Sequence, residues 1–151
     1  MTSATPAHRS GFRIPYPDDP YEVGAGPFWV PDVAEPDGTL VLWTERKHCN
    51  GSGVVHGGLL ATMADLAVCW LAVIGHSDER AVTVSLTTDY AGGAVEGDVL
   101  VARPEIVRRT GSLVFARCTL RAHEGGPDGA ESRPVAVASA VIKRMRRTPR
   151  A

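Results

Sequence analysis

Cysteine is scarce in this sequence, and the few cysteines present form no recognisable framework. Only three occur, at positions 49, 69 and 118, and no two of them make a C-x-x-C pair. The chain also opens on polar and proline-containing residues and not on a signal peptide. These absences argue against a disulfide-stapled secreted domain and predict a protein of the reducing cytoplasm.

An excess of charge of one sign is also lacking. Lys and Arg number 16 and Asp and Glu number 17, which leaves a formal net charge of -1 at pH 7. No long-range field therefore marks the whole molecule as a binder of nucleic acid or of membranes. We expect neither partner, and any affinity for anions must come from local groups.

No apolar run is long enough to span a bilayer. The longest, Leu59 to Ile74, is shorter than the roughly 20 residues that a membrane helix needs. An ionisable residue, Asp65, also lies in its middle. The run is therefore predicted to be a helix of a globular domain.

Two signatures of hydrolytic sites are missing as well. The nucleophile motif G-x-S-x-G does not occur, and Gly51-Ser52-Gly53 lacks the strand-to-helix setting of a serine hydrolase. His48, Cys49 and His56 have no fourth metal ligand at a suitable spacing. The sequence therefore predicts no metal and no other cofactor.

Length and composition allow one domain with a sizeable core. The chain has 151 residues, of which 44% are hydrophobic. Residues 1–38 predict an irregular, proline-rich amino-terminal arm, residues 39–146 the domain itself, and residues 147–151 a basic carboxy-terminal tail. Aromatic residues in the arm indicate that part of it packs on the domain; they are Tyr16, Tyr21, Phe28 and Trp29.

Hydrophobic periodicity predicts one helix and five strands. A helix of about residues 57–75, buried on nearly all sides, follows a strand at Thr39–Lys47. Four further β-rich runs are separated by short, turn-like breaks: Ala81–Tyr90, Asp98–Arg109, Ser112–Ala122 and Pro134–Met145. This order predicts an α+β fold in which a curved antiparallel meander wraps around one long central helix.

Asp65 is the first candidate for chemistry. An ionised carboxylate in an apolar helix is costly unless it is hydrogen-bonded or faces a wet cleft. Its neighbours at helical spacing are mostly small: Gly58, Ala61, Thr62, Val68, Cys69 and Ala72. This stripe leaves room for a substrate, or equally for the backbone of a second subunit, to approach the carboxylate.

The residues His56-Gly57-Gly58 mark the start of that helix. First-turn N–H groups lack intrahelical partners and the helix dipole adds partial positive charge, so an oxyanion could be stabilised here. Two glycines would let a carbonyl approach the backbone, although they could equally serve a tight loop-to-helix turn. His56 could likewise be a cap or a core histidine, and Asn50 a turn residue.

Together these residues match the pattern of a known protein family. The pattern H-x-N-x-x-G-x-x-H-G-G, with an Asp seven residues later, resembles the signature of hotdog-fold thioesterases of the phenylacetate-pathway (PaaI-like) type. Its fixed positions are His48, Asn50, Gly53, His56, Gly57, Gly58 and Asp65. In the order and spacing of predicted strands, the resemblance extends over roughly Thr39 to Lys143.

The resemblance implies a hotdog fold, an acyl-CoA substrate, and a homodimer or dimer of dimers with active sites between subunits. Asp65 would activate water or attack the thioester, and the Gly57 N–H would hold the oxyanion. Asn50 and His56 would orient the carbonyl and the water. Thr83 matches the position of a hydroxyl near that water, and Ser85 is expected two residues on along the same face.

Binding of the CoA phosphates is expected at the turn after residue 108, where backbone amides lie beside cations. The candidate residues for substrate and CoA are Gly58, Tyr90, Arg109, Thr110, Gly111, Ser112, Lys143 and Arg144. Arg146, Arg147 and Arg150 are instead interpreted as a solvated basic tail.

Two other functions are compatible with the expected fold. A hotdog protein could bind acyl groups without catalysis, although the complete set of Asn50, His56 and Asp65 argues against it. A hotdog dehydratase would need a histidine and an acid arranged differently across the cleft. The acyl chain itself, whether aryl, short or medium, is left open by the sequence.

Overall fold

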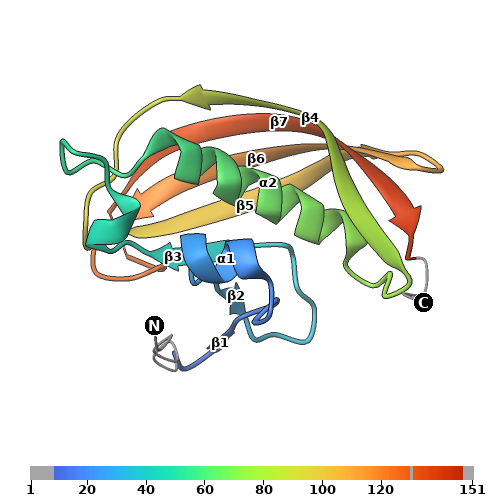
Figure 1. Ribbon diagram of the computed structural model, residues 1–151, viewed down its shortest axis with the longest axis horizontal. Helices are drawn as coiled ribbons and strands as arrows, with labels where there is room; N and C mark the ends of the chain where they lie inside the picture. The colour runs from blue at the N-terminus through green and yellow to red at the C-terminus, as the bar shows by residue number, and fades with distance from the viewer. Residues whose placement is uncertain (1–8, 130, 148–151) are drawn as a thin grey trace.

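A curved antiparallel sheet wraps around one long helix (Figure 1). The computed structural model describes residues 9–129 and 131–147. The elements are β1 (Phe12–Arg13), α1 (Pro20–Ala25), β2 (Val30–Pro31), β3 (Leu40–Trp43), a 3-10 turn (Arg46–His48), α2 (Gly57–Val73), β4 (Glu79–Tyr90), β5 (Val99–Arg109), β6 (Leu113–His123) and β7 (Ser132–Arg146). The predicted α+β architecture, with one helix near residues 57–75, is confirmed.

Helix α2 forms the centre of the core, and it contacts all five strands of the main sheet. Only Gly58 among its 17 residues is exposed, in agreement with the predicted burial on nearly all sides. Its fully buried residues are Leu60, Met63, Ala64, Ala67, Val68 and Ala72. Gly75 then adopts a φ of 78°, a left-handed conformation that favours glycine, and turns the chain towards β4.

Helix α2 is the longest helix in the described residues, and none there combines the length and apolar character needed to cross a membrane.

The order of the strands corrects the predicted meander. Neighbouring strands follow the order β3-β5-β6-β7-β4, and every neighbouring pair is antiparallel. Strands β5, β6 and β7 do form a meander, but β4 pairs with β7 and not with β5. The reason is that α2 crosses the concave face of the sheet and delivers the chain to the edge opposite β3 (Figure 1). β4 is therefore an edge strand, with no partner on its outer side in the described part of the chain.

The first strand of the main sheet is shorter than predicted, because it ends at Trp43 and not at Lys47. After Trp43, the Thr44 hydroxyl lies within hydrogen-bond distance of two carbonyl oxygens. Its oxygen is 2.7 Å from that of Val95 and 2.8 Å from that of Asp98. Glu45 and His48 then close the 3-10 turn through a reciprocal capping box.

A β-bulge interrupts β4 at Val84. Thr83 pairs with Ile142 and Ser85 with Val141, so that Val84 is an extra residue without a partner of its own. The bulge shifts the alternation of side chains: Thr83 is half-buried, whereas Ser85 is exposed. The prediction that Ser85 lies on the same face as Thr83 is wrong for this reason.

The arm packs on the domain through its aromatic residues, as predicted. Phe28 and Trp29 are buried, and the Trp29 N–H donates to the Val41 carbonyl at 2.8 Å. The arm also contains the short helix α1, whose first N–H groups, those of Tyr21 and Glu22, donate to the Asp19 carboxylate at 3.0 Å.

The division of the chain at residues 38 and 39 stays a prediction. Of the predicted basic tail, residues 147–151, only Arg147 lies within the described residues. Its backbone N–H donates to the Asp78 carbonyl at 2.7 Å.

Glu22 of α1 makes the stability of the protein depend on pH. Burial, and then the nearby Asp19 carboxylate, raise the pKa of Glu22 from 4.5 to about 7. Between these values the folded protein holds a proton that the unfolded chain has lost, so stability falls as the pH rises through this window. Because Glu22→Gln cannot ionise, we expect a higher Tm than the parent at about pH 8 and a similar Tm at about pH 4 in scanning calorimetry. The exposed Glu35→Gln is the control, and an equal Tm difference at both pH values would contradict the prediction.

Candidate active site

The loop that precedes α2 is a tight hairpin. Cys49 and Val55 form an isolated antiparallel bridge, and the Asn50 N–H donates to the Val54 carbonyl at 2.8 Å. The turn needs a glycine at Gly53, which has a φ of 80°. The chain from His48 to the start of α2 is thereby held by its own backbone.

Asn50 is a turn residue, as one of the two interpretations expected. Its Oδ1 accepts the Ser52 N–H at 2.9 Å and the Val54 N–H at 3.3 Å. Because the oxygen is held by these two donors, the amide NH₂ group is fixed on the other side. Asn50 is exposed, so that this NH₂ group is free to donate to a ligand.

His48 is a structural residue. Its ring is buried; Nδ1 accepts the Glu45 N–H at 2.8 Å, and Nε2 lies 3.2 Å from the Gly26 carbonyl oxygen. Nε2 therefore carries the proton and donates to Gly26. Burial lowers the pKa of His48, which keeps the ring neutral. This pair of contacts joins the 3-10 turn to the arm.

His56 caps α2, and the cap leaves one ring nitrogen free. Its Nδ1 accepts the Gly58 N–H at 2.9 Å. Nδ1 is therefore unprotonated, and in the neutral ring the proton is on Nε2. His56 is exposed, so Nε2–H can donate to a bound group.

Gly57 provides the free backbone donor at the helix start. No described residue accepts its N–H, whereas the Gly58 N–H is already bound by His56. A Cβ at Gly57 would lie 3.4 Å from the Tyr90 ring, so Tyr90 covers one side of this position. Unpaired donors at a helix start are suited to bind a carbonyl oxygen that gains negative charge.

Asp65 lies further along α2, beside the edge strand β4. Its Oδ1 accepts the Thr83 hydroxyl at 2.5 Å, and the Cys69 Sγ lies 3.3 Å from that hydroxyl oxygen. The structure therefore brings Asp65 and Thr83 together, and the role of the Thr83 hydroxyl near a reacting water stays a prediction. Burial raises the pKa of the Cys69 thiol to about 11, so it stays protonated near neutral pH and is a poor nucleophile.

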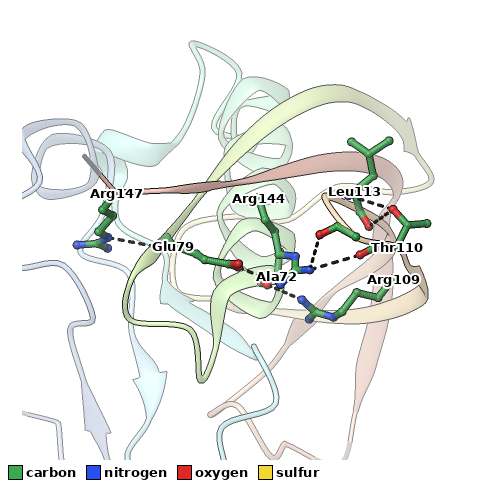
Figure 2. Close-up of polar contacts among 8 residues, drawn as sticks. Ala72, Glu79, Arg109, Thr110, Leu113, Arg144 and Arg147 are labelled. Carbon is green, nitrogen blue, oxygen red and sulfur yellow. Dashed lines mark hydrogen bonds and ion pairs between the residues drawn. The ribbon is translucent and has the colours of Figure 1, made fainter. Parts of the chain in front are cut away.

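A polar cluster surrounds the other end of α2 (Figure 2). The Arg109 guanidinium donates to the Ala72 carbonyl at 2.9 Å, in the last turn of the helix. Arg144 pairs with Glu79 at 2.9 Å and donates to the carbonyl oxygens of Thr110 and Gly111. These cations therefore serve the fold of their own chain.

The candidates for substrate and CoA binding lie at two places: Gly58 and Tyr90 are beside Gly57 at the start of α2, whereas the residues of the turn after 108 lie at its other end. The turn at 109–112 and Arg144 adjoin the carboxy-terminal end of α2, about 22 Å along the helix from Gly57. Lys143 is exposed on β7 opposite Leu113. Ser112 joins the cluster through its backbone, since its carbonyl accepts the Arg144 N–H at 2.8 Å.

Two residues of the site region were not predicted. The hydroxyl groups of Tyr21 and Thr62 lie 2.9 Å apart and join α1 to α2. Thr62 belongs to the small-residue stripe around Asp65, but no signal in the sequence pairs it with a tyrosine 41 residues away. Among the residues that the structure describes, no three His, Cys, Asp or Glu side chains form a group able to hold a metal ion.

Comparison with known proteins decides the family. The family model described as the thioesterase superfamily matches residues 52–127, the segment that contains Gly57, Asp65 and Thr83. The chain belongs to the thioesterase superfamily. A candidate esterase of Pseudomonas aeruginosa is 33% identical to it over 115 residues, which cover 76% of this chain and 86% of that protein.

Solved structures of this superfamily share the fold. A thioesterase family protein from Silicibacter pomeroyi superimposes with a TM-score of 0.73 at 22% identity, covering 87% of this chain and 93% of that one. The E. coli PaaI protein from the phenylacetic acid degradation operon superimposes with a TM-score of 0.70 at 18% identity, covering 86% of this chain and 87% of that one. The hotdog fold that the motif implied is confirmed.

Replacement of Arg144 tests whether the polar cluster at the end of α2 stabilises the fold. The Arg144 side chain is 11% exposed and that of its partner Glu79 22%. Arg144→Gln leaves Glu79 unpaired, so we expect a loss of about 3 kcal/mol in the free energy of unfolding, measured by denaturant titration without ligand. Arg108→Gln, at an exposed position in β5, is the control. A loss below that of the control would mean that the ion pair does not support the fold.

Proposed function

We propose that this protein is an acyl-CoA thioesterase, which hydrolyses an acyl-CoA to the free acid and CoA. The observation that carries the proposal is the pairing on one helix of an unpartnered N–H, at Gly57, with a half-buried carboxylate, at Asp65, in a chain of the thioesterase superfamily. The first group can hold an oxyanion, and the second can serve as a base or a nucleophile.

One chain alone does not bring these two groups to the same carbonyl. Eight residues of helix separate Gly57 from Asp65, or about 12 Å, whereas the oxyanion donor and the attacking group must both lie about 3 Å from the reacting atoms. We propose that a second copy of the chain supplies the carboxylate that lies close to the Gly57 N–H.

The edge strand β4 supports a two-fold dimer. If β4 pairs antiparallel with β4 of a second copy, the two sheets become continuous and both α2 helices lie on the same face, in opposite directions. Asp65 is held against β4 by Thr83, on the side of the helix that would face the partner. Asp65 of one copy can then approach the helix start of the other, so each site is shared by two subunits.

The same antiparallel arrangement brings the end of one α2 towards the start of the other. The turn at 109–112 of one subunit would then lie on the side of the partner's oxyanion donor. Arg109 and Arg144 are engaged within the chain, whereas the N–H groups of Gly111 and Ser112 have no acceptor among the described residues and Lys143 is exposed. We propose these free donors for the CoA phosphates.

Hydrolysis follows from these positions. The thioester carbonyl oxygen accepts the Gly57 N–H, and Asp65 takes a proton from a water molecule whose oxygen adds to the carbonyl carbon. The tetrahedral intermediate collapses with cleavage of the carbon–sulfur bond, and the proton held by Asp65 goes to the leaving thiolate. In the alternative, Asp65 itself attacks the carbonyl, and the carbon–sulfur bond breaks to give a mixed anhydride and the CoA thiolate. Water then cleaves the anhydride to the free acid and the Asp65 carboxylate, and the proton that it releases goes to the thiolate. The Nε2–H of His56 and the amide of Asn50 are free donors for the carbonyl or the water.

Two solved structures of similar fold support the choice of acyl-CoA. One is described as a hexameric broad-specificity acyl-coenzyme A thioesterase, with a TM-score of 0.64 at 18% identity over 74% of this chain and 81% of that one. The other, from Streptococcus mutans, is bound to acetyl-CoA, with a TM-score of 0.63 at 19% identity over 76% and 87%. Both likenesses are of fold, and the substrate of this chain is therefore proposed from its own site.

Replacement of Asp65 tests the reaction. Asp65→Asn keeps the size of the side chain but removes the base, so we expect kcat on acyl-CoA to fall by at least about 100-fold. Thiol release from a panel of aryl and aliphatic acyl-CoA substrates measures the effect. Asp128→Asn, exposed in the turn between β6 and β7, is the matched control and should keep the parent rate. Full activity of Asp65→Asn would exclude the mechanism, and a folded parent that hydrolyses no acyl-CoA would favour a binding role.

Replacement of Val84 tests the shared site. Val84 is 60% exposed on the edge strand, where a charge would be buried in the proposed dimer. We expect Val84→Asp to shift the mass in light scattering from two chains to one and to remove hydrolysis with it. Val33→Asp, which changes an exposed valine of the arm, should leave both unchanged. An active monomer would show that one chain completes the site.

A further inference from the structure

A cavity of about 360 Å³ opens between the arm and the start of α2. Tyr21 and Gly24 of α1 form one wall, and Leu59 and Thr62 of α2 form another. Lys47, in the 3-10 turn, lines a third side. The reaction described above assigns no role to this space.

The cavity adjoins the groups proposed to bind the thioester. His56 and Gly58 line it, and both belong to the helix start at which the Gly57 N–H is free. A thioester whose carbonyl oxygen is bound by Gly57 therefore has this space directly beside it. The Tyr90 ring covers a different side of Gly57 and does not line the cavity.

Helix α1 is held firmly enough to act as a wall. Its start is capped by Asp19, and its Tyr21 hydroxyl bonds to Thr62 at 2.9 Å. Directly after the helix, the Gly26 carbonyl is bound by the buried His48. These contacts fix α1 at both ends, against α2 on one side and the 3-10 turn on the other.

We infer, on the basis of the proposed function, that this cavity receives the acyl group and that α1 restricts it to compact acyl groups with a hydrogen-bonding substituent. The volume of about 360 Å³ is near the low end of the range for small-molecule pockets, which favours a compact acyl group. The walls carry the hydroxyl groups of Tyr21 and Thr62 and the ammonium of Lys47. The Tyr21 and Thr62 hydroxyl groups use one O–H in their mutual hydrogen bond, so the other O–H and the Lys47 ammonium remain as donors for a ligand. A plain alkyl chain would take these donors from water without replacing their hydrogen bonds, whereas a hydroxyl substituent would replace them.

The position of α1 in the sequence places this wall outside the segment that the family model matches. The match to the thioesterase superfamily begins at residue 52, whereas α1 ends at Ala25. Gly57 and Asp65 lie in the matched segment, and one wall of the acyl cavity lies outside it. Proteins with the same reacting groups can therefore differ in their acyl preference through such an arm.

Two opposite changes in α1 test the inference. A Cβ at Gly24 meets no atom within 4 Å, and the backbone there is not left-handed, so Gly24→Leu adds volume to the wall without a clash. Tyr21 is 63% exposed, and Tyr21→Ala opens the end of the cavity. The change also removes the hydrogen bond to Thr62, so the Tm of this variant is compared with that of the parent. Val23, 45% exposed on the same helix and not in the cavity wall, provides the control Val23→Ala.

The measurement is kcat/KM for acetyl-CoA, hexanoyl-CoA and a hexanoyl-CoA with a terminal hydroxyl group. We expect Gly24→Leu to lower the ratio of hexanoyl-CoA to acetyl-CoA by about tenfold, because lost or added methylene contacts have effects of this size. Tyr21→Ala should raise that ratio and reduce the parent's preference for the hydroxylated chain. Val23→Ala should match the parent on all three substrates.

The outcomes separate this inference from the function on which it rests. An active parent whose ratios are unchanged in both folded variants overturns the inference and leaves the thioesterase proposal intact. A parent that prefers the plain hexanoyl chain to the hydroxylated one overturns the inference that the cavity favours an acyl group with a hydrogen-bonding substituent. A folded parent that hydrolyses none of the three substrates overturns the proposed function, and the acyl cavity with it.

Discussion

The packing of α2 into the concave face of the sheet is the constraint on which the rest of the structure depends. The helix can lie close to the strands because several of its buried residues are alanines. That depth places its first turn beside Tyr90, its middle against Thr83 of β4, and its last turn within reach of Arg109. A change in helix position would disturb all three regions together.

The same helix also holds apart the two groups that the proposed hydrolysis requires, the Gly57 N–H and the Asp65 carboxylate. A free N–H at its start and a carboxylate two turns later suit one reaction, but the helix keeps them about 12 Å apart. The structure leaves β4 as an open edge and holds Asp65 on that side through Thr83. The proposed site, shared between two antiparallel copies, would use all of these features, while the Arg144–Glu79 pair stays within one chain.

The arm adds to this common core a part that the matched family segment does not include. His48 joins the arm to the turn before α2, and Tyr21 joins it to α2 itself. The motif histidine that opens the signature therefore supports the fold, while His56 is free to donate from Nε2. The arm and the helix contribute different walls of one cavity, so the wall formed by α1 can change while the helix start stays the same.

The sequence by itself determined the features that depend on local pattern. Helical spacing and loop chemistry identified α2, its start at His56-Gly57-Gly58 and the carboxylate of Asp65. The spacing of these groups gave the resemblance to the thioesterase family. Only the tertiary structure decided which strand lies beside β4, that the bulge turns Ser85 outwards, and that Arg144 is paired. The physical reason is that strand order, register and ion pairing join residues far apart in the chain, whereas periodicity reports only the neighbours along it.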